Sequence, residues 1–258
     1  MSTLYFATAA KSAVGLVRAG NEDSAMTSRN LIAVADGMGG HAAGEVASRI
    51  AITGLASESE IFAKTGIDLE SADDLYASAL STIDATISEY AIENPELAGM
   101  GTTLSSLFLR ESAVAVLHVG DSRIYRLRGN IFEQLSTDHT VIQELLAQGT
   151  ITEADVATHP QRSVLTQVLM GDGRNQPALS IYEVKADDRF LLCSDGLTNV
   201  VGDKEIKSII KGKARGAAVD ALVDAAYMNG APDNVTVIVA DVLNNDIQEP
   251  LTMLGAAK

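Results

Sequence analysis

Four aspartates share one setting in this sequence, because each stands at the end of an apolar segment with a glycine beside it or close by. They are Asp36, Asp121, Asp195 and Asp233. An aspartate is a poor strand residue, and its charge is costly at a buried strand end unless another group compensates it. A single case is better explained as a turn or a helix N-cap. Four cases in one chain favour a shared role.

Such aspartates could hold divalent metal ions. Strand ends at one edge of a sheet sandwich can bring distant carboxylates together, and their like charges raise one another's pKa unless cations lie among them. Ligand sets made only of oxygen suit Mg²⁺ and Mn²⁺. A zinc site is disfavoured, since the chain has one cysteine and four histidines without ligand-like spacing. Gly37, directly after Asp36, would let its backbone carbonyl approach a second ion.

Hydrolysis of a phosphoryl group fits this ligand chemistry. Two ions bridged by one carboxylate lower the pKa of a water between them, and charge neutralisation supplies much of the catalysis. The phosphate also needs a fixed cation, and Arg18 stands just before Glu22 and Asp23. A guanidinium binds phosphate oxygens bidentately, so Arg18 beside a metal cluster would clamp the substrate. Taken alone, Arg18 is better explained by a surface salt bridge to Glu22.

The elements that must position these residues follow from the apolar pattern, which switches between periods of two and near four. Strands are expected at 31–35, 103–109, 113–119, 123–128, 189–193 and 235–242. Helices are expected from Glu45 onward and at 72–93, 141–148, 203–211 and 216–228. Strands that follow one another directly over 103–135 indicate hairpins and largely antiparallel sheets. The pattern predicts an α+β fold, in which helices cover packed sheets.

The chain is expected to form a single domain over 1–243. A small flap is expected at about 147–175, where Thr152 and Asp155 resemble a helix start and His159-Pro160 would end that helix. After residue 243 the periodicity is lost, so 244–258 is predicted to be a flexible tail or the start of a linker.

Composition excludes several classes of protein. The 258 residues are 47% hydrophobic, and their formal net charge of −15 argues against nucleic acid as a partner. The N-terminus lacks a basic segment followed by an apolar run, and no stretch approaches the roughly 20 apolar residues that span a bilayer. The lone Cys193 fits a core thiol in a reducing compartment. A cytoplasmic location is therefore expected, without membrane insertion of this chain.

The motifs, taken in order, resemble the PPM family of metal-dependent protein phosphatases, the type-2C class. They are RAGNED, VADGMGGHAAGE, GMGTT, VGDSR, DHT, CSDGL and PDNVTV. The flap with THPQRS is similar to that of bacterial members, especially those that oppose membrane-bound Ser/Thr kinases with PASTA repeats. The resemblance implies a central antiparallel β-sandwich flanked by helix pairs. It also implies hydrolysis of phosphoserine and phosphothreonine on proteins by a monomer, either soluble or the catalytic part of a membrane-anchored protein.

The resemblance also implies roles for individual residues toward two core Mn²⁺ or Mg²⁺ ions. Asp36 would bridge both ions, and Gly37 would offer its carbonyl oxygen to the second. Asp195 and Asp233 would complete the shell of the first ion. Arg18 corresponds to the arginine that binds the phosphate.

Further residues would act at the edge of this centre. Glu22, with Asp23, would act on the second ion through water. Asp121 would join Asp195 in holding a third, weaker ion, which the flap residue Ser163 could approach. Asn234 would support the metal ligands.

The group that protonates the leaving alcohol is less well marked. Many eukaryotic members have a histidine directly after the Asp-Gly pair, whereas this chain has Met38 there and His41 nearby. His41 is therefore a candidate acid, with a structural role or a water as the alternative. His139 is expected to fix its loop, and Thr102 and Thr103 to shape the start of the adjacent strand.

Two other classes of function compete with protein dephosphorylation. A degenerate phosphatase fold kept as a binding platform would be expected to lose metal ligands, yet each ligand position here carries an oxygen donor. A two-metal nuclease or phosphodiesterase would need a basic groove for its substrate. The expected partners are phosphoproteins, including Ser/Thr kinases and their targets.

Overall fold

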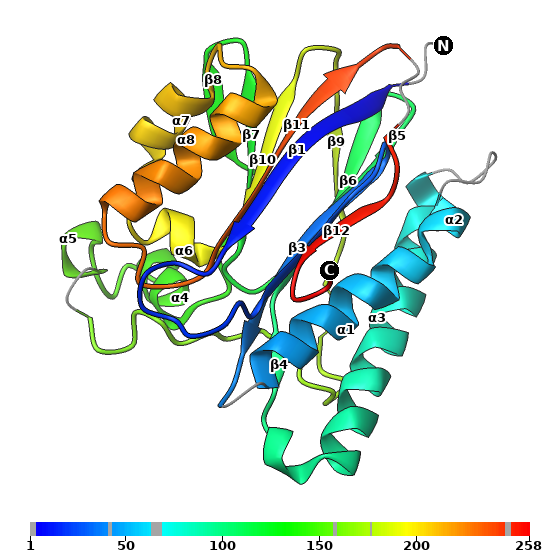
Figure 1. Ribbon diagram of the computed structural model, residues 1–258, viewed down its shortest axis with the longest axis vertical. Helices are drawn as coiled ribbons and strands as arrows, with labels where there is room; N and C mark the ends of the chain where they lie inside the picture. The colour runs from blue at the N-terminus through cyan, green and yellow to red at the C-terminus, as the bar shows by residue number, and fades with distance from the viewer. Residues whose placement is uncertain (1–3, 41–42, 63–68, 157–158, 176, 246–248) are drawn as a thin grey trace.

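The computed structural model describes residues 4–258 except 41–42, 63–68, 157–158, 176 and 246–248. Two antiparallel sheets pack face to face, and helices cover the outer face of each (Figure 1). The predicted helix-covered β-sandwich is thus confirmed. The helices that flank the sheets are α1 (Ala43–Ser57), α2 (Ser59–Phe62) and α3 (Leu69–Glu93) on one side, and α7 (Asp203–Ile210) and α8 (Arg215–Met228) on the other.

The first sheet lies under α7 and α8. Its strands, in spatial order, are β1 (Tyr5–Ala13), β11 (Val235–Leu243), β10 (Arg189–Cys193), β7 (Arg123–Arg128) and β8 (Ile131–Gln134). The second sheet lies under α1 and α3. Its strands are β12 (Thr252–Gly255), β2 (Asp23–Thr27), β3 (Leu31–Met38), β5 (Leu104–Arg110), β6 (Ala113–Val119) and β9 (Ser180–Glu183), with β4 (Gly101–Thr102) paired to β3.

Short elements complete the chain between the main ones. They are η1 (Pro95–Leu97), α4 (Val141–Ala147), α5 (Glu153–Val156) and α6 (Asp195–Thr198). In α5 the expected helix start is confirmed, since Thr152 donates from its backbone nitrogen and from Oγ1 to Asp155 Oδ2. The expected end of this helix at His159-Pro160 follows residues 157–158, which lie outside the described residues. The flap is tied to the sandwich by isolated bridges from Thr140 to Leu165 and from Thr102 to Leu169.

Strand parity decides which residues reach the space between the sheets. In β3, Ile32 and Val34 join the core between the sheets, whereas Leu31, Ala33 and Ala35 pack under α1 and α3. Both faces are buried, so the strand is a continuous apolar run. Continuing the alternation by two residues places Asp36 on the inter-sheet side, where the apolar stack ends.

The same parity applies to β2 across the sheet. Ala25 packs in the inter-sheet core, so Asp23 faces the same interior. Phe6 and Phe190 close that core from the opposite sheet, with an edge-to-face ring contact of 6.0 Å between centroids. The sandwich therefore forces acidic residues toward its interior at one end.

The C-terminal residues differ from the expectation of a flexible tail. Residues 252–255 form β12, which pairs with β2 from Thr252↔Thr27 to Gly255↔Ser24. Ala256 N then donates to the Asp23 carbonyl oxygen at 2.8 Å. Glu249 accepts hydrogen bonds from the backbone and hydroxyl of Thr8. The segment lacks its own periodicity because it is ordered by pairing with residues more than 200 positions away.

No helix in the described ranges combines the length and the apolar character that crossing a bilayer requires.

Candidate functional site

The four aspartates found in the sequence meet at one end of the sandwich. Asp36 lies near the end of β3, Asp121 lies in the turn between β6 and β7, Asp195 begins α6 directly after β10, and Asp233 stands just before β11. Their charges act on one another, since Asp195, Asp121 and Asp233 each raise the pKa of Asp36. The sequence prediction that these carboxylates converge is supported by this coupling.

Asp36 and Asp195 are near neighbours in this cluster. Their carboxyl groups lie close enough to share a hydrogen bond, and Asn199 Nδ2 donates to Asp195 Oδ2 at 2.9 Å. Burial, followed by the charge of Asp23, holds the pKa of Asp36 well above its ordinary value. Burial, followed by the charge of Asp233, raises the pKa of Asp195. Two carboxylates at this spacing cannot both be ionised at low cost without a cation between them.

Asp23 adds a fifth carboxylate, and one of its oxygens has no partner. Ser194 Oγ donates to Asp23 Oδ2 at 2.7 Å, whereas Oδ1 is buried without a hydrogen bond. The side chain is 1% exposed, and burial raises its pKa to about 7. Burial also raises the pKa of Asp121 to about 7. An orphaned buried oxygen among crowded carboxylates is typical of a site built for a cation.

The backbone around Asp36 is held by the threonines expected to shape the neighbouring strand. Asp36 N donates to Thr103 Oγ1 at 2.9 Å, and Thr103 N donates to Asp36 O at 2.9 Å. Thr102 Oγ1 donates to the same carbonyl at 3.0 Å. At Gly37 a Cβ would overlap the carbonyl oxygen of Gly44 in α1, so only glycine fits there. These contacts fix the Asp-Gly pair against α1.

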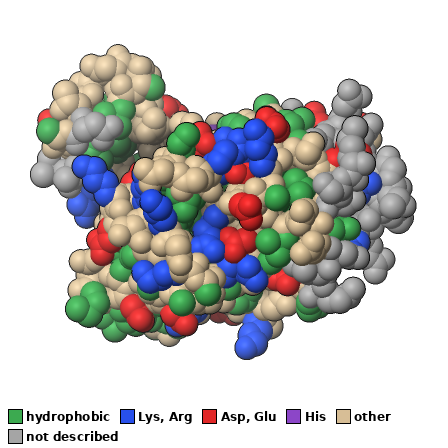
Figure 2. All heavy atoms as spheres, turned by 90° about the horizontal axis from the view of Figure 1, so that it is seen from above, with side chains coloured by type: hydrophobic (Ala, Val, Ile, Leu, Met, Phe, Trp, Pro, Cys, Tyr) green, Lys and Arg blue, Asp and Glu red, His purple; other side chains and the backbone are tan. Residues whose placement is uncertain are grey.

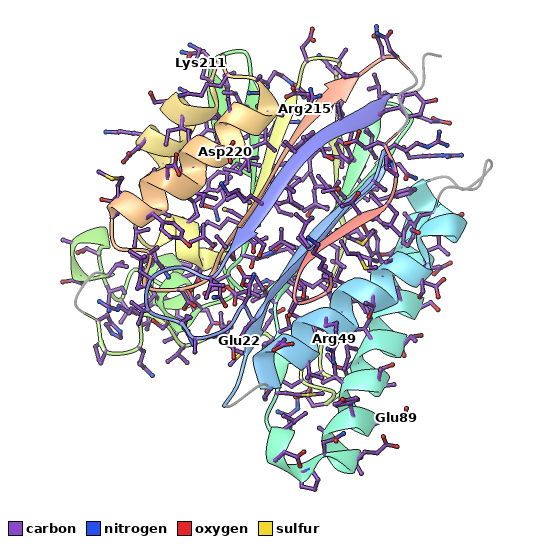
Figure 3. The ribbon with its side chains drawn as sticks, viewed as in Figure 1. Glu22, Arg49, Glu89, Lys211, Arg215 and Asp220 are labelled. Atoms are coloured by element: carbon purple, nitrogen blue, oxygen red, sulfur yellow. The ribbon has the colours of Figure 1, made fainter. Side chains whose placement is uncertain are left out.

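Arg18 faces this cluster from the loop between β1 and β2. Its Nη2 donates to Asp233 Oδ2 at 2.7 Å, while Nη1 lies 3.8 Å from Glu22 Oε2. The salt bridge to Glu22 that the sequence favoured is therefore the longer of two ion pairs. The Arg18 side chain is 48% exposed, which leaves the guanidinium accessible to an anion. Figure 3 places Glu22 at the same end of the sandwich, beside the start of α1.

Asn234 holds the loop that carries Arg18. Its Nδ2 donates to Val14 O at 2.8 Å and to Gly20 O at 2.9 Å, and its Oδ1 accepts from Glu22 N at 2.8 Å. The side chain is 3% exposed. The sequence suggested a role near the metal ligands for this residue, and the observed contacts all go to the backbone of 14–22. Nothing in the sequence motif pointed to this loop closure.

His139 holds the turn that carries Asp121. Gly120 N donates to His139 Nδ1 at 3.1 Å, and His139 N donates to Gly120 O at 2.8 Å. Burial lowers the pKa of His139, which favours the neutral ring with Nδ1 as an acceptor. Its carbonyl also accepts from Thr166 N at 2.9 Å, so the same residue ties the turn to the flap. This geometry agrees with the loop-fixing role expected for His139.

Three more residues singled out in the sequence are His41, Ser163 and Met38. His41 lies outside the described residues. Ser163 is exposed in a flap turn, and no hydrogen bond or ion pair between it and Asp121 exists in the described structure. Met38 is 38% exposed beside the Asp-Gly pair.

The donor set fits divalent cations in its chemistry. It consists of carboxylate oxygens and a tightly packed Asp-Gly backbone, which are ligands that Mg²⁺ and Mn²⁺ accept. Within the described ranges, no three His, Cys, Asp or Glu side chains are gathered closely enough to form a finished ligand shell. The fit therefore rests on the crowded, uncompensated carboxylates and on the orphaned oxygen of Asp23.

Comparison with known proteins matches the chain to one family. Residues 20–225 match the family model described as protein phosphatase 2C. The chain is 40% identical to the serine/threonine protein phosphatase PstP of Mycobacterium tuberculosis H37Rv, over 99% of this chain and 48% of PstP. It therefore spans about half the length of PstP. It is 34% identical to the serine/threonine phosphatase Stp of Listeria monocytogenes EGD-e, over 88% of this chain and 92% of Stp.

Solved structures show the same similarity. The crystal structure of M. tuberculosis PstP aligns with a TM-score of 0.86 at 40% identity, covering 92% of this chain and 98% of that one. The catalytic domain of PstP in complex with two manganese ions aligns with a TM-score of 0.85 at 38% identity, covering 93% of this chain and all of that one.

Proposed function

The chain belongs to the protein phosphatase 2C family, and from that premise we propose that it hydrolyses phosphoserine and phosphothreonine on proteins. The observation that carries this proposal is the convergence of Asp23, Asp121 and Asp195 on Asp36, whose pKa is held high by burial and then by their charges, with the half-exposed Arg18 beside them. The arrangement supplies ligands for hard cations and a separate clamp for a phosphate.

Two divalent ions would be held by this end of the sandwich. Asp36 would serve both, Asp195 and Asp233 would complete one shell, and the carbonyl of Gly37 would serve the other. When bound, such ions supply positive charge to the phosphoryl group and lower the pKa of a water. The PstP catalytic domain binds two manganese ions, which supports Mn²⁺ here, with Mg²⁺ as the alternative.

The edge residues would tune this centre. Glu22 and Asp23 would orient waters around the second ion, and the buried orphan oxygen of Asp23 supports that assignment. Asp121, with Asp195, would hold a third and weaker ion, and Ser163 of the flap could approach it. The hydrogen-bonded turn of Gly120 and His139 would keep Asp121 in place.

Arg18 would bind the substrate phosphate. In the absence of substrate its guanidinium donates to Asp233, and a phosphate with two oxygens offers a stronger bidentate acceptor. Asn234 keeps the loop from shifting, so the guanidinium is positioned before substrate arrives. If the loop no longer held the Arg18 guanidinium in position, KM would rise and kcat would fall.

Protonation of the leaving alcohol is the step with the fewest candidates. His41, three residues after Met38, is proposed as the acid, with a water as the alternative donor. A serine or threonine alkoxide is a poor leaving group, so its proton must arrive as the bond to phosphorus breaks.

The proposed substrates are phosphoproteins, including Ser/Thr kinases and their targets. A cytoplasmic location is proposed for this chain. It is also proposed to act as a monomer. The net charge of −15 supports protein substrates over nucleic acid.

The direct test is release of inorganic phosphate from a phosphothreonine peptide in the presence of Mn²⁺. We expect activity that a chelator removes and that fresh Mn²⁺ restores. Asp233→Ala should lower turnover even when Mn²⁺ is saturating. Wild-type turnover by that variant would contradict the two-ion mechanism, and failure of the wild-type chain to release phosphate would favour a binding role instead.

A further inference from the structure

The loop that carries Arg18 also presents two large apolar side chains to solvent. Leu16 is 63% exposed and Val17 is 72% exposed. Single exposed apolar residues are ordinary on protein surfaces, but two neighbours next to a phosphate clamp call for an explanation.

The exposure of Leu16 and Val17 is imposed by a fixed backbone. Gly15 adopts a φ of +82°, and a Cβ there would overlap the Asp233 carbonyl oxygen. Gly15 N donates to Tyr227 Oη at 3.1 Å, and Leu16 N donates to Ala231 O at 2.9 Å. Together with the Asn234 bonds at both ends of the loop, these contacts hold its conformation. The backbone that presents the two side chains outward is therefore already ordered, and binding costs only side-chain freedom.

Resting on the function proposed above, we propose that Leu16 and Val17 form a docking surface for an apolar side chain of the substrate polypeptide. The occupied position lies within two residues of the phosphorylated residue. The surface is continuous with Arg18, and consecutive Cα atoms are about 3.8 Å apart. An extended substrate whose phosphate is on Arg18 therefore has neighbouring residues within reach of Leu16 and Val17.

The apolar character of the surface favours an apolar occupant over a charged one. The exposed side chains of Leu16 and Val17 offer neither a hydrogen bond nor an ion pair, so a charged residue that covered them would lose water without compensation. An apolar residue gains from the same contact. The inferred substrate class is a phosphoserine or phosphothreonine segment with a flanking aliphatic or aromatic residue.

Two phosphothreonine peptides that differ only in having leucine or serine on both sides of the phosphorylated residue test this proposal. For the wild-type chain with Mn²⁺, we expect kcat/KM to be about tenfold higher for the leucine peptide, which is the size of discrimination that one apolar contact gives. The double variant Leu16→Ser/Val17→Ser should lose that preference.

A matched control is Ile131→Ser. Ile131 is 65% exposed and begins β8, beyond the end of β7 farthest from Asp121. This variant should keep the wild-type preference, and thermal unfolding should show that both variants remain folded. Turnover of p-nitrophenyl phosphate, which has no flanking residue, separates the outcomes. Equal rates on both peptides by an active wild-type chain, or an undiminished preference in the double variant, would overturn the docking proposal. Absence of turnover on all three substrates would instead overturn the proposed function, and the docking proposal with it.

Discussion

The two ends of the β-sandwich carry acidic residues under opposite conditions. At the end away from the candidate site, Arg128 donates to both oxygens of the buried Asp188 at 2.7 and 2.6 Å. Asp241 accepts from both Arg189 and Arg215. Figure 2 shows that Lys and Arg side chains gather around a few acidic ones on the face seen from above, and Figure 3 places Lys211 and Arg215 there.

At the candidate site arginine pairs with the carboxylates only at the rim, where Arg18 lies against Asp233 and Glu22 in the described structure. In the part of the chain that the structure describes, no ion pair joins Asp23, Asp36, Asp121 or Asp195 to a lysine or arginine. A paired carboxylate lies close by for contrast. Asp138 pairs at 2.7 Å with Arg123, which stands two residues after Asp121. Carboxylates paired with arginine stabilise the fold, whereas crowded carboxylates without a partner indicate a site that a cation completes.

The largest expected effect comes from removing the central charge. Asp36→Asn should lower Mn²⁺-dependent phosphate release by about 10³-fold, since the shared ligand and its charge are both lost. In chelator the same variant should unfold at a higher temperature than the wild type, because repulsion with Asp23 and Asp195 is relieved. Phosphate release and thermal unfolding of one preparation measure both effects. A variant that is active, or that is less stable without metal, would break the contrast between the two ends.

The metal-free protein should lose stability as pH rises. Asp23 and Asp121 have pKa values near 7 in the folded state, against about 3.9 in an unfolded chain. The folded state therefore binds more protons between these values, so stability is fully present below about pH 4 and falls until about pH 7. The loss should reach a few kcal/mol, since one pKa unit is about 1.4 kcal/mol. Urea unfolding in chelator at pH 5 and pH 7.5 measures it, and stability that rises over this window would contradict the assignment.

Removal of a carboxylate at the arginine-paired end should have the opposite consequences to Asp36→Asn, namely lower stability and unchanged activity. Asp188→Asn removes a carboxylate that is 1% exposed and leaves Arg128 without its partner. We expect a loss of about 2 kcal/mol, below the full value for a buried pair because Arg128 is partly exposed. Turnover with saturating Mn²⁺ should stay near that of the wild type. Urea unfolding and the phosphate assay test both parts, and a loss of metal dependence here would blur the distinction between the ends.

An effect of similar size on stability concerns the C-terminal strand that supports Asp23. Gly255 has a φ of +68°, and a Cβ there would overlap the carbonyl oxygen of Asp23. Gly255→Ala should cost about 2 kcal/mol and weaken Mn²⁺ binding, since β12 would move from β2. Gly212→Ala is the matched control, because Gly212 has a φ of +74° and open space around it, so it should cost about 1 kcal/mol. Calorimetric Mn²⁺ titration compares the two, and equal affinities would show that the strand does not support the site.

Much of this contrast was predictable from the sequence. The strand-end aspartates and the alternation through Ile32 and Val34 to Asp36 are local patterns, and the long helix α3 follows its apolar period. The resemblance to a known family added the roles proposed for individual residues at the site. The fold class and the strands around the site followed from these signals.

The rest depends on contacts between distant residues. The alanine-rich β1 and the aperiodic β12 acquire their structure by pairing, at positions such as Tyr5↔Leu243 and Gly255↔Ser24. Asn234 reaches the loop around Arg18 across more than 200 positions. The unpartnered Oδ1 of Asp23 depends on the fold, because Ser194, which follows β10 in the other sheet, donates only to Oδ2 of the same carboxylate. No local sequence signal encodes such distances.

The most direct test of the central claim is anomalous diffraction at the manganese edge from crystals grown with Mn²⁺. The wild-type chain should show two strong peaks beside Asp36, about 3.5–4 Å apart as in other two-metal hydrolases. Both peaks should disappear in Asp36→Asn and remain in Asp188→Asn. Two peaks that persist in Asp36→Asn, or manganese bound only at the arginine-rich end, would contradict the account.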